Sequence, residues 1–517
     1  MADQTGNSPQ VRRQDDTASI STSRISSTHA EHSGSPESWR SSRGVRYHAH
    51  RFLRGIGLVT VYNSPVDAKL ILAQRFVRVF AYGLVALNLA AYLAALGISE
   101  TQIGVFFGLT LVGDLFMVML LTQFAHVVGL KVVLVTGAVL MTASGLVFAC
   151  SDDYRVLLAA AVFGVISPSA TEVGPFKSIE ESALFTLVTH NIVDVLSWYG
   201  TAEFTSIAVG VAVSASITDY LQRTQAWSFV SACRAIFLLY ATIGVLKIIL
   251  SSCLSHRIEP WHHRDKEGRA VQDAEQQPTP SSSAAEEVHE PLLAPTPSIP
   301  VPPASKQGYS VFSLDKRERL ILLKVCTLMA FDACAVGLSS VPWQTYFVRT
   351  GFDVPTSQLG TIFFISNMLA AAGTISSSAL ARRMGNMITL AVTYYPAAII
   401  MLFFGLPDTI SILLVLILVE GFLSVIYVAP RNALIGRILT PSKRVASLGV
   451  MNLVKMTTNA SGSFLTGVLA DRDMFWLVFV LAGALKIVYV TGMLYTFLAV
   501  DRRMTRDENE RAHEAET

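Results

Sequence analysis

The chain has 517 residues, of which 51% are hydrophobic and only 15% charged, and its mean hydropathy is +0.47. Soluble domains carry about 25% charged residues, so this composition excludes an ordinary soluble domain and indicates a membrane protein. The formal net charge of +2 is close to balance and predicts no nucleic-acid partner. The five cysteines have no paired or metal-binding spacing, so we expect neither a disulfide framework nor a metal site.

The N-terminal segment, residues 1–66, begins with a stretch rich in Ser, Arg, Gln and Thr. It lacks the apolar core of a secretory signal, and chains of this composition do not bury enough apolar surface to fold. We therefore expect a disordered cytoplasmic tail.

Twelve apolar runs follow, and a helix needs about 20 mainly apolar residues to cross a bilayer. The sequence therefore predicts an all-α membrane protein with 12 transmembrane helices in two six-helix bundles, residues 67–255 and 318–499. The runs fall at 72–96, 103–124, 132–151, 155–176, 194–218, 227–254, 319–347, 358–380, 387–406, 410–430, 445–469 and 475–499.

The segment between the two sets of runs, residues 256–317, is rich in Pro, Ser and charge without periodicity, which predicts a flexible cytoplasmic linker. Residues 500–517 form a polar C-terminal tail. Lys and Arg are more frequent in the short loops on the side of the linker and tails, so we expect both termini to be cytoplasmic. The cell membrane is the expected location, with the vacuolar or another internal membrane as the alternative.

The two halves of the chain repeat each other. Gln102-Ile103-Gly104 opens the second run and Gln358-Leu359-Gly360 opens the eighth, an offset of 256 residues. The pairs Gly129 and Gly385, and Asp152 and Asp408, lie in the following loops at the same offset. A parallel repeat of two six-helix halves is typical of secondary transporters.

Two loops carry a family resemblance. QFAHVVGLKVVL after the second run and ALARRMGNMITL after the eighth resemble the loop G-x-L-A-D-R-x-G-R-K of the major facilitator superfamily. The matching positions are Ala125, Gly129 and Lys131 in the first copy, and Ala381, Arg383 and Gly385 in the second. The acid of the family loop helps to close the cytoplasmic gate, and His126 and Arg382 replace it here. The resemblance implies a gating role for these loops, together with Asp114, for which helix packing is the alternative.

The stretch SPSATEVGPFKSIEES at 167–182, together with RFVRVFAYG at 75–83, resembles a branch of fungal and bacterial permeases of the same superfamily. Ala170-Thr171 stand where that branch has Gly-Asn. We expect Lys177, Glu180 and Glu181 to lie in an interfacial loop. Glu172 is about one turn deeper, so it is a candidate for substrate binding, with anchoring of the loop as the alternative.

Ionisable residues near the middle of a predicted span cost roughly 3 kcal/mol or more if they face lipid, so they should face a cavity or a partner. Five residues qualify by position: Asp114, Glu203, Asp332, Glu420 and Lys455. A carboxylate in a low-dielectric cavity has a raised pKa and exchanges protons readily. Glu203, Asp332 and Glu420 are therefore candidates for proton coupling.

Further polar residues share helical faces and are candidates for substrate binding. Arg75, Arg78 and Tyr82 lie on one face of the first run. Two more faces combine Glu420, Tyr427 and Arg431 in the tenth run and Asn452, Lys455 and Asn459 in the eleventh. We expect Glu420 and Lys455 to form a buried pair, with a purely structural role as the alternative.

No P-loop, catalytic triad or zinc-binding pattern is present in the sequence, so we expect neither an enzyme nor a cofactor. The first functional hypothesis is a monomeric, proton-coupled exporter of small organic molecules such as a metabolite, toxin or drug. The alternatives are a proton-coupled importer of a nutrient, such as a sugar or organic anion, and a membrane receptor or scaffold.

Overall fold

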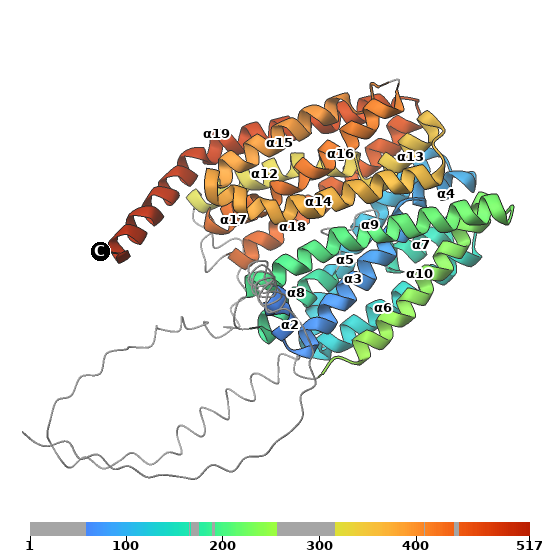
Figure 1. The fold of residues 1–517 in the computed structure, drawn as a ribbon, viewed down its shortest axis with the longest axis horizontal. Coiled ribbons are helices and arrows are strands. Elements are labelled where there is room, and N and C mark those ends of the chain that lie inside the picture. The colour runs from blue at the N-terminus through green and yellow to red at the C-terminus, as the bar shows by residue number, and fades with distance from the viewer. Residues whose placement is uncertain are drawn as a thin grey trace, which may run out of the picture. The chain divides into compact units, whose positions relative to one another are not determined.

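The computed structural model describes residues 58–164, 166, 175–188, 192–255, 316–407, 409–438 and 444–516, and all regular structure within these ranges is α-helical (Figure 1). Nearly all of the predicted linker, nearly all of the N-terminal tail, and Glu172 lie outside the described residues.

The helices of the N-terminal half follow the predicted runs closely except in the fourth run, residues 155–176, where the structure describes only the short helix α7 and the start of α8. They are α2 (Leu58–Asn63), α3 (Val66–Ala86), α4 (Leu89–Ala95), α5 (Glu100–Val128), α6 (Leu130–Cys150), α7 (Tyr154–Gly164), α8 (Pro175–Leu187), α9 (Ile192–Thr224) and α10 (Phe229–Ser252). In this half α3 packs on α9 and α6 packs on α10.

The C-terminal half repeats this plan. Its helices are α12 (Lys316–Leu338), α13 (Val341–Phe352), α14 (Thr356–Met384), α15 (Asn386–Phe403), α16 (Ile410–Ile426), α17 (Val428–Ile438), α18 (Arg444–Ala470) and α19 (Phe475–Glu516). Helix α12 packs on α18, α15 on α19 and α14 on α16. Helix α19 continues through most of the predicted C-terminal tail.

Three of the predicted spans are broken into two helices: α3 and α4, α12 and α13, and α16 and α17. The first pair meets at an angle of 40°. In the described part of the chain, nine helices are long and apolar enough to cross a bilayer, or ten if that bent pair is one span. The fold class is therefore as predicted, whereas the count of 12 is not established.

The repeat is visible in the backbone of the two corresponding loops. Gly129, between α5 and α6, has a φ of 102°, and Gly385, between α14 and α15, has a φ of 82°. Residues other than glycine rarely adopt backbone angles with such a positive φ. Both halves therefore use glycine for the same sharp connection.

The two halves contact each other along two seams, α5 against α18 and α9 against α14. Small residues make these approaches close: a Cβ built on Gly104 would lie 2.8 Å from Cα of Gly467, and one on Gly360 would lie 2.0 Å from Cβ of Ala215. Small residues at helix interfaces let backbones pack tightly where apolar lipid offers little driving force.

Polar contacts join the two halves at one end of the helices. This end lies opposite the end at which α10 stops and α12 begins, next to residues 256–315. The Tyr346 hydroxyl donates to the Glu100 carboxylate at 2.7 Å, and the Thr101 hydroxyl donates to Asp471 at 3.0 Å. Trp343 is fully buried there against Phe107. This end of the interface between the halves is thus held by hydrogen bonds and aromatic packing.

We predict that Gly467→Ala lowers the Tm of the purified protein, because the added Cβ would lie 2.5 Å from the Glu100 carbonyl oxygen and 2.6 Å from Cα of Gly104. Overpacking of this kind costs about 1–3 kcal/mol. Gly449→Ala, on the same helix α18, is the matched control because its Cβ would meet nothing within 4 Å. Equal Tm values for the two variants would show that the seam is not closely packed.

Candidate functional site

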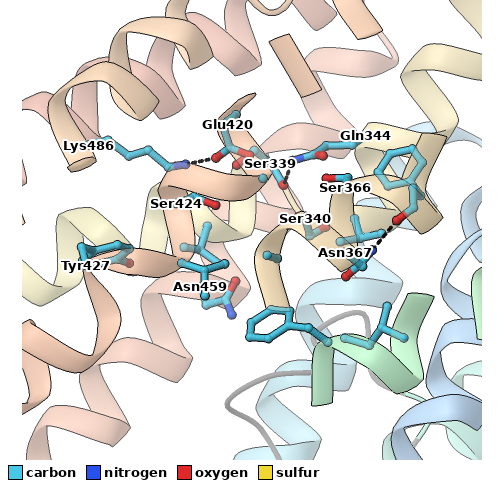
Figure 2. Close-up of a pocket in the computed structure, with 18 of the residues that line it drawn as sticks. Ser339, Ser340, Gln344, Ser366, Asn367, Glu420, Ser424, Tyr427, Asn459 and Lys486 are labelled. Carbon is cyan, nitrogen blue, oxygen red and sulfur yellow. Dashed lines mark hydrogen bonds and ion pairs between the residues drawn. The ribbon is translucent and has the colours of Figure 1, made fainter. Parts of the chain in front are cut away.

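A central cavity of about 230 Å³ lies between helices of both halves (Figure 2). The N-terminal half contributes a mainly apolar wall, made of Tyr82, Leu111, Phe204 and Ile207. The C-terminal half contributes most of the polar groups: Ser339, Ser340, Gln344, Ser366, Asn367, Ser424, Asn459 and Ser463. The cavity therefore offers many uncharged hydrogen-bonding groups on one side and an apolar surface on the other.

The break between α12 and α13 supplies two of these polar residues, and the first turn of α13 supplies a third, Gln344. Ser339 and Ser340 stand between the two helices, and Pro342 occupies the first turn of α13, where a missing N–H is tolerated. The Gln344 amide donates to the Ser339 carbonyl at 2.8 Å (Figure 2). Non-helical backbone at membrane depth is tolerated where it lines a cavity, and this break does so.

An ion pair stands in the wall of the central cavity. The Lys486 ammonium on α19 donates to the Glu420 carboxylate on α16 at 3.0 Å, and both side chains are nearly buried (Figure 2). The expected pairing of Glu420 with Lys455 is therefore wrong. Helix α19 packs across α15 and α12 and brings Lys486 to the carboxylate, which the spacing within single helices does not reveal.

A second buried group centres on Asp332 of α12. Its carboxylate accepts hydrogen bonds from Arg431 at 3.1 Å and from the Tyr427 hydroxyl at 3.2 Å, and also from the Tyr394 hydroxyl. The rings of Tyr394 and Tyr427 lie 3.9 Å apart between centroids. Asp332 and Arg431 thus form a hydrogen-bonded salt bridge, which compensates both buried charges.

A smaller cavity, of about 50 Å³, adjoins this group. Its polar lining consists of Asp332, Tyr427, Arg431, Asn452, Lys455 and Asn459. Val336, Tyr427 and Asn459 line both cavities, so the two are neighbours. The tenth and eleventh runs do converge on cavities, as their polar faces predicted.

The described charged candidates Arg75, Arg78 and Glu203 of the N-terminal half line neither cavity. Arg75 pairs with Glu203, and its guanidinium lies over the Tyr199 ring at 4.7 Å from the centroid. Neither Arg75 nor Glu203 lines either cavity. Tyr82 is the one candidate of the first run that lines the central cavity.

The expectation that Lys177, Glu180 and Glu181 lie in an interfacial loop is wrong, because all three belong to α8. Glu180 is fully buried, and its carboxylate accepts from Arg78 at 3.1 Å and from the Tyr199 hydroxyl at 2.6 Å. The Lys247 ammonium of α10 lies 3.9 Å from the other oxygen of the same carboxylate. Glu180 therefore ties α3, α8, α9 and α10 together.

The gating candidates are described only in part. Asp114 is buried on α5, next to Gly113, whose Cα faces Val162 of α7. Arg383 is exposed, and Gly129 and Gly385 form the turns described above. The side chains of His126 and Arg382 lie outside the described residues.

Sequence reasoning missed Lys486 and Lys247, although both are ionisable residues well inside apolar runs and the rule that selected Glu420 also applies to them. It also missed Tyr394, because a tyrosine within an apolar helix does not by itself indicate a buried polar cluster.

We predict that Lys486→Met destabilises the protein by about 3–5 kcal/mol, because it leaves the Glu420 carboxylate buried without its cation. Adding Glu420→Gln to the Lys486→Met variant should restore part of the lost stability. Adding Glu420→Gln to a Lys455→Met variant should not restore stability. A double-mutant cycle of thermal unfolding measures this coupling, and additive effects in the Lys486 cycle would contradict the pairing.

We predict a similar loss for Glu180→Gln, which leaves Arg78 and Lys247 buried without a carboxylate. The control is Asp219→Asn, which breaks the exposed pair with Arg223 and should change stability by less than about 1 kcal/mol. Denaturant or thermal unfolding of the two variants would reveal the difference, and equal stabilities would argue against a structural cluster around Glu180.

Comparison with known proteins agrees with this architecture. Residues 71–410 match the model of the Major Facilitator Superfamily. The protein named "Uncharacterized membrane protein YJR124C" from Saccharomyces cerevisiae is 31% identical over 447 residues, which cover 86% of this chain and 96% of that protein.

Solved structures of transporters share the fold at low sequence identity. A D-xylose–proton symporter has a TM-score of 0.60 and 14% identity, over 84% of this chain and 98% of that chain. The nucleoside transporter NupG has a TM-score of 0.57 and 14% identity, over 84% and 99%. A bacterial homologue of the human lysosomal transporter Spinster has a TM-score of 0.57 and 11% identity, over 83% and 94%.

The family match covers most of the chain, and members of this family are membrane transporters rather than enzymes. The chain therefore belongs to the major facilitator superfamily and is a multi-pass membrane protein of the secondary-transporter class.

Proposed function

We propose that the protein is a proton-coupled exporter of a small hydrophilic organic molecule and that the central cavity binds this molecule during alternating access. The observation that carries the proposal is the placement of the Glu420–Lys486 pair in the wall of that cavity. A proton and a solute would then act on the same ion pair.

The lining of the cavity supports a small, hydrophilic substrate. Serine hydroxyls and the amides of Gln344, Asn367 and Asn459 offer donors and acceptors, and Tyr82 and Phe204 offer an apolar face. Binding sites of this kind combine an apolar wall with a few polar groups that fix orientation. A volume of about 230 Å³ favours a metabolite over a large amphipathic drug.

Competition at Glu420 supports exchange of proton for solute. A protonated Glu420 no longer balances Lys486, so proton binding changes the charge of the cavity that the solute occupies. If solute binding favours the ionised pair, a proton that enters displaces the solute, and the inward proton gradient drives export. Asp332, beside the smaller cavity, is the second coupling candidate, and Glu203, paired with Arg75, is the third.

Import of a hydrophilic nutrient is the alternative, and the many hydroxyl and amide groups of the lining favour it. Import would follow if the solute bound better after Glu420 takes up a proton. The two directions therefore differ in the sign of the effect of protonation on solute affinity.

The sequence repeat supports two six-helix bundles, residues 67–255 and 318–499, and the bias of Lys and Arg toward one set of loops supports cytoplasmic termini. We assign the protein to the cell membrane as a monomer, and to the fungal and bacterial branch that the stretch at 167–182 resembles.

The experiment that identifies the substrate compares metabolites inside and outside cells with and without the protein. Export predicts that a small hydrophilic compound accumulates inside cells that lack the protein. A deficit of such a compound inside those cells would instead support import, and no change in either compartment would contradict transport of a metabolite.

We predict that Glu420→Gln abolishes the response of transport to an imposed pH gradient, because a neutral amide cannot exchange a proton. Exchange of labelled solute across proteoliposomes at equal pH should remain, although a changed solute affinity is expected. The control is Asp219→Asn, which lines neither cavity and should keep the full pH response. A full response in the Glu420 variant would remove this residue from the coupling.

A further inference from the structure

A cluster of three tyrosines contacts both buried ion pairs of the C-terminal half. The pairs are Asp332 with Arg431 and Glu420 with Lys486. The cluster consists of Tyr394 on α15, Tyr427 at the end of α16 and Tyr489 on α19, whose ring centroids lie 3.9–6.5 Å apart.

Tyr394 is the member of the cluster that touches both pairs. Its hydroxyl donates to the Asp332 carboxylate, and the Lys486 ammonium lies over its ring at 5.7 Å from the centroid. A cation within about 6 Å of the face of an aromatic ring is attracted to it. One almost completely buried side chain therefore contacts the acid of one pair and the base of the other.

The hydrogen bond from Tyr394 to Asp332 depends on the charge of the carboxylate. A hydrogen bond to an ionised acceptor is roughly twice as strong as one between neutral groups. The same bond polarises the phenol, which strengthens the attraction of its ring for the Lys486 ammonium. Neutralisation of Asp332 therefore weakens both contacts of Tyr394.

Other charged and titratable groups face Asp332 as well. Arg431 and the Tyr427 hydroxyl bond to its carboxylate directly, and Lys455 of α18 lines the same smaller cavity. Tyr489 of α19 packs against the rings of the cluster. Tyr394 adds to this set a contact with Lys486, the partner of Glu420.

The backbone beside Tyr394 lacks one helical hydrogen bond. Pro396 lies inside α15, two residues after Tyr394. A proline has no N–H, so it cannot donate to the carbonyl four residues before it, which here belongs to Val392. The missing bond lowers the cost of a local change in α15, so Tyr394 can follow a change at Asp332.

We propose that Tyr394 is a positioning residue that couples the two buried ion pairs, so that neutralisation of Asp332 loosens the Glu420–Lys486 pair in the wall of the central cavity (Figure 2). A proton taken up at Asp332, beside the smaller cavity, then acts on the central cavity through Tyr394. This inference rests on the proposed transport function, because it connects two of the proposed coupling residues.

The test compares apparent Tm values of the purified full-length protein in detergent, with Asp332→Asn as the neutralised state. Asp332→Asn and Glu420→Gln form a double-mutant cycle, which isolates the coupling between the two pairs. The Tm shift of the double variant should differ from the sum of the single shifts by at least about 2 °C. The same cycle in a Tyr394→Phe background should lose at least about half of this difference, because the variant keeps the ring and removes the hydroxyl.

Tyr395→Phe is the matched control. The Tyr395 hydroxyl is exposed and shares a hydrogen bond with Thr491 at 2.9 Å, so its removal should leave the coupling unchanged. A purely structural role of Tyr394 would lower the Tm without changing the coupling. If Asp332→Asn does not fold, a cycle of Tyr394→Phe with Glu420→Gln replaces it. That cycle should be non-additive, whereas Tyr395→Phe with Glu420→Gln should be additive.

Three results would overturn the proposal: no coupling between Asp332→Asn and Glu420→Gln, full coupling in the Tyr394→Phe background, or an equal loss of coupling in the Tyr395→Phe background. Additive shifts in the replacement cycle would overturn it as well. Failure of the transport function is a separate outcome. Tyr394-dependent coupling in a protein whose Glu420→Gln variant keeps its full response to a pH gradient would remove Glu420 from proton coupling and retain the link through Tyr394.

Discussion

Charge compensation inside an apolar medium is the constraint on which this structure depends. An ionised side chain that faces hydrocarbon is costly, and removal of one partner from a buried pair leaves the other uncompensated. The described residues meet this constraint by joining helices that are distant in sequence. The buried groups are Arg75 with Glu203, Glu180 with Arg78 and Lys247, Asp332 with Arg431, and Glu420 with Lys486.

These buried groups differ between the halves. In the N-terminal half the described ion pairs line neither cavity, and they join α3, α8, α9 and α10. In the C-terminal half they form cavity walls, and a ligand or a proton that reaches them changes a compensated charge. The two halves share one helix plan but contribute unequally to the central cavity: the N-terminal half provides a mainly apolar wall, and the C-terminal half provides most of the polar and all of the charged lining residues described.

The seams between the halves follow from small residues rather than charge. At Gly104 and Gly467 the backbones of α5 and α18 touch, and at Gly360 the backbone of α14 meets Ala215 of α9. Close approaches of this kind rest on backbone packing between small residues, which lipid cannot replace. The hydrogen bonds from Tyr346 and Thr101 add direction at one end of the seams.

Local sequence alone determined the helices, the repeat and the ionisable residues that are too costly to expose to lipid. The length of an apolar run, a glycine in a loop and a charge in the middle of a run are each properties of a single segment. It located α5, α6, α14 and α15 within a few residues and selected Asp332, Glu420, Arg431 and Lys455 for polar surroundings. Tertiary structure alone decided the partners. Glu420 meets Lys486 instead of Lys455, and Glu180 lies in the interior instead of a loop, because the packing of α19 and α8 sets which charges lie within bonding distance.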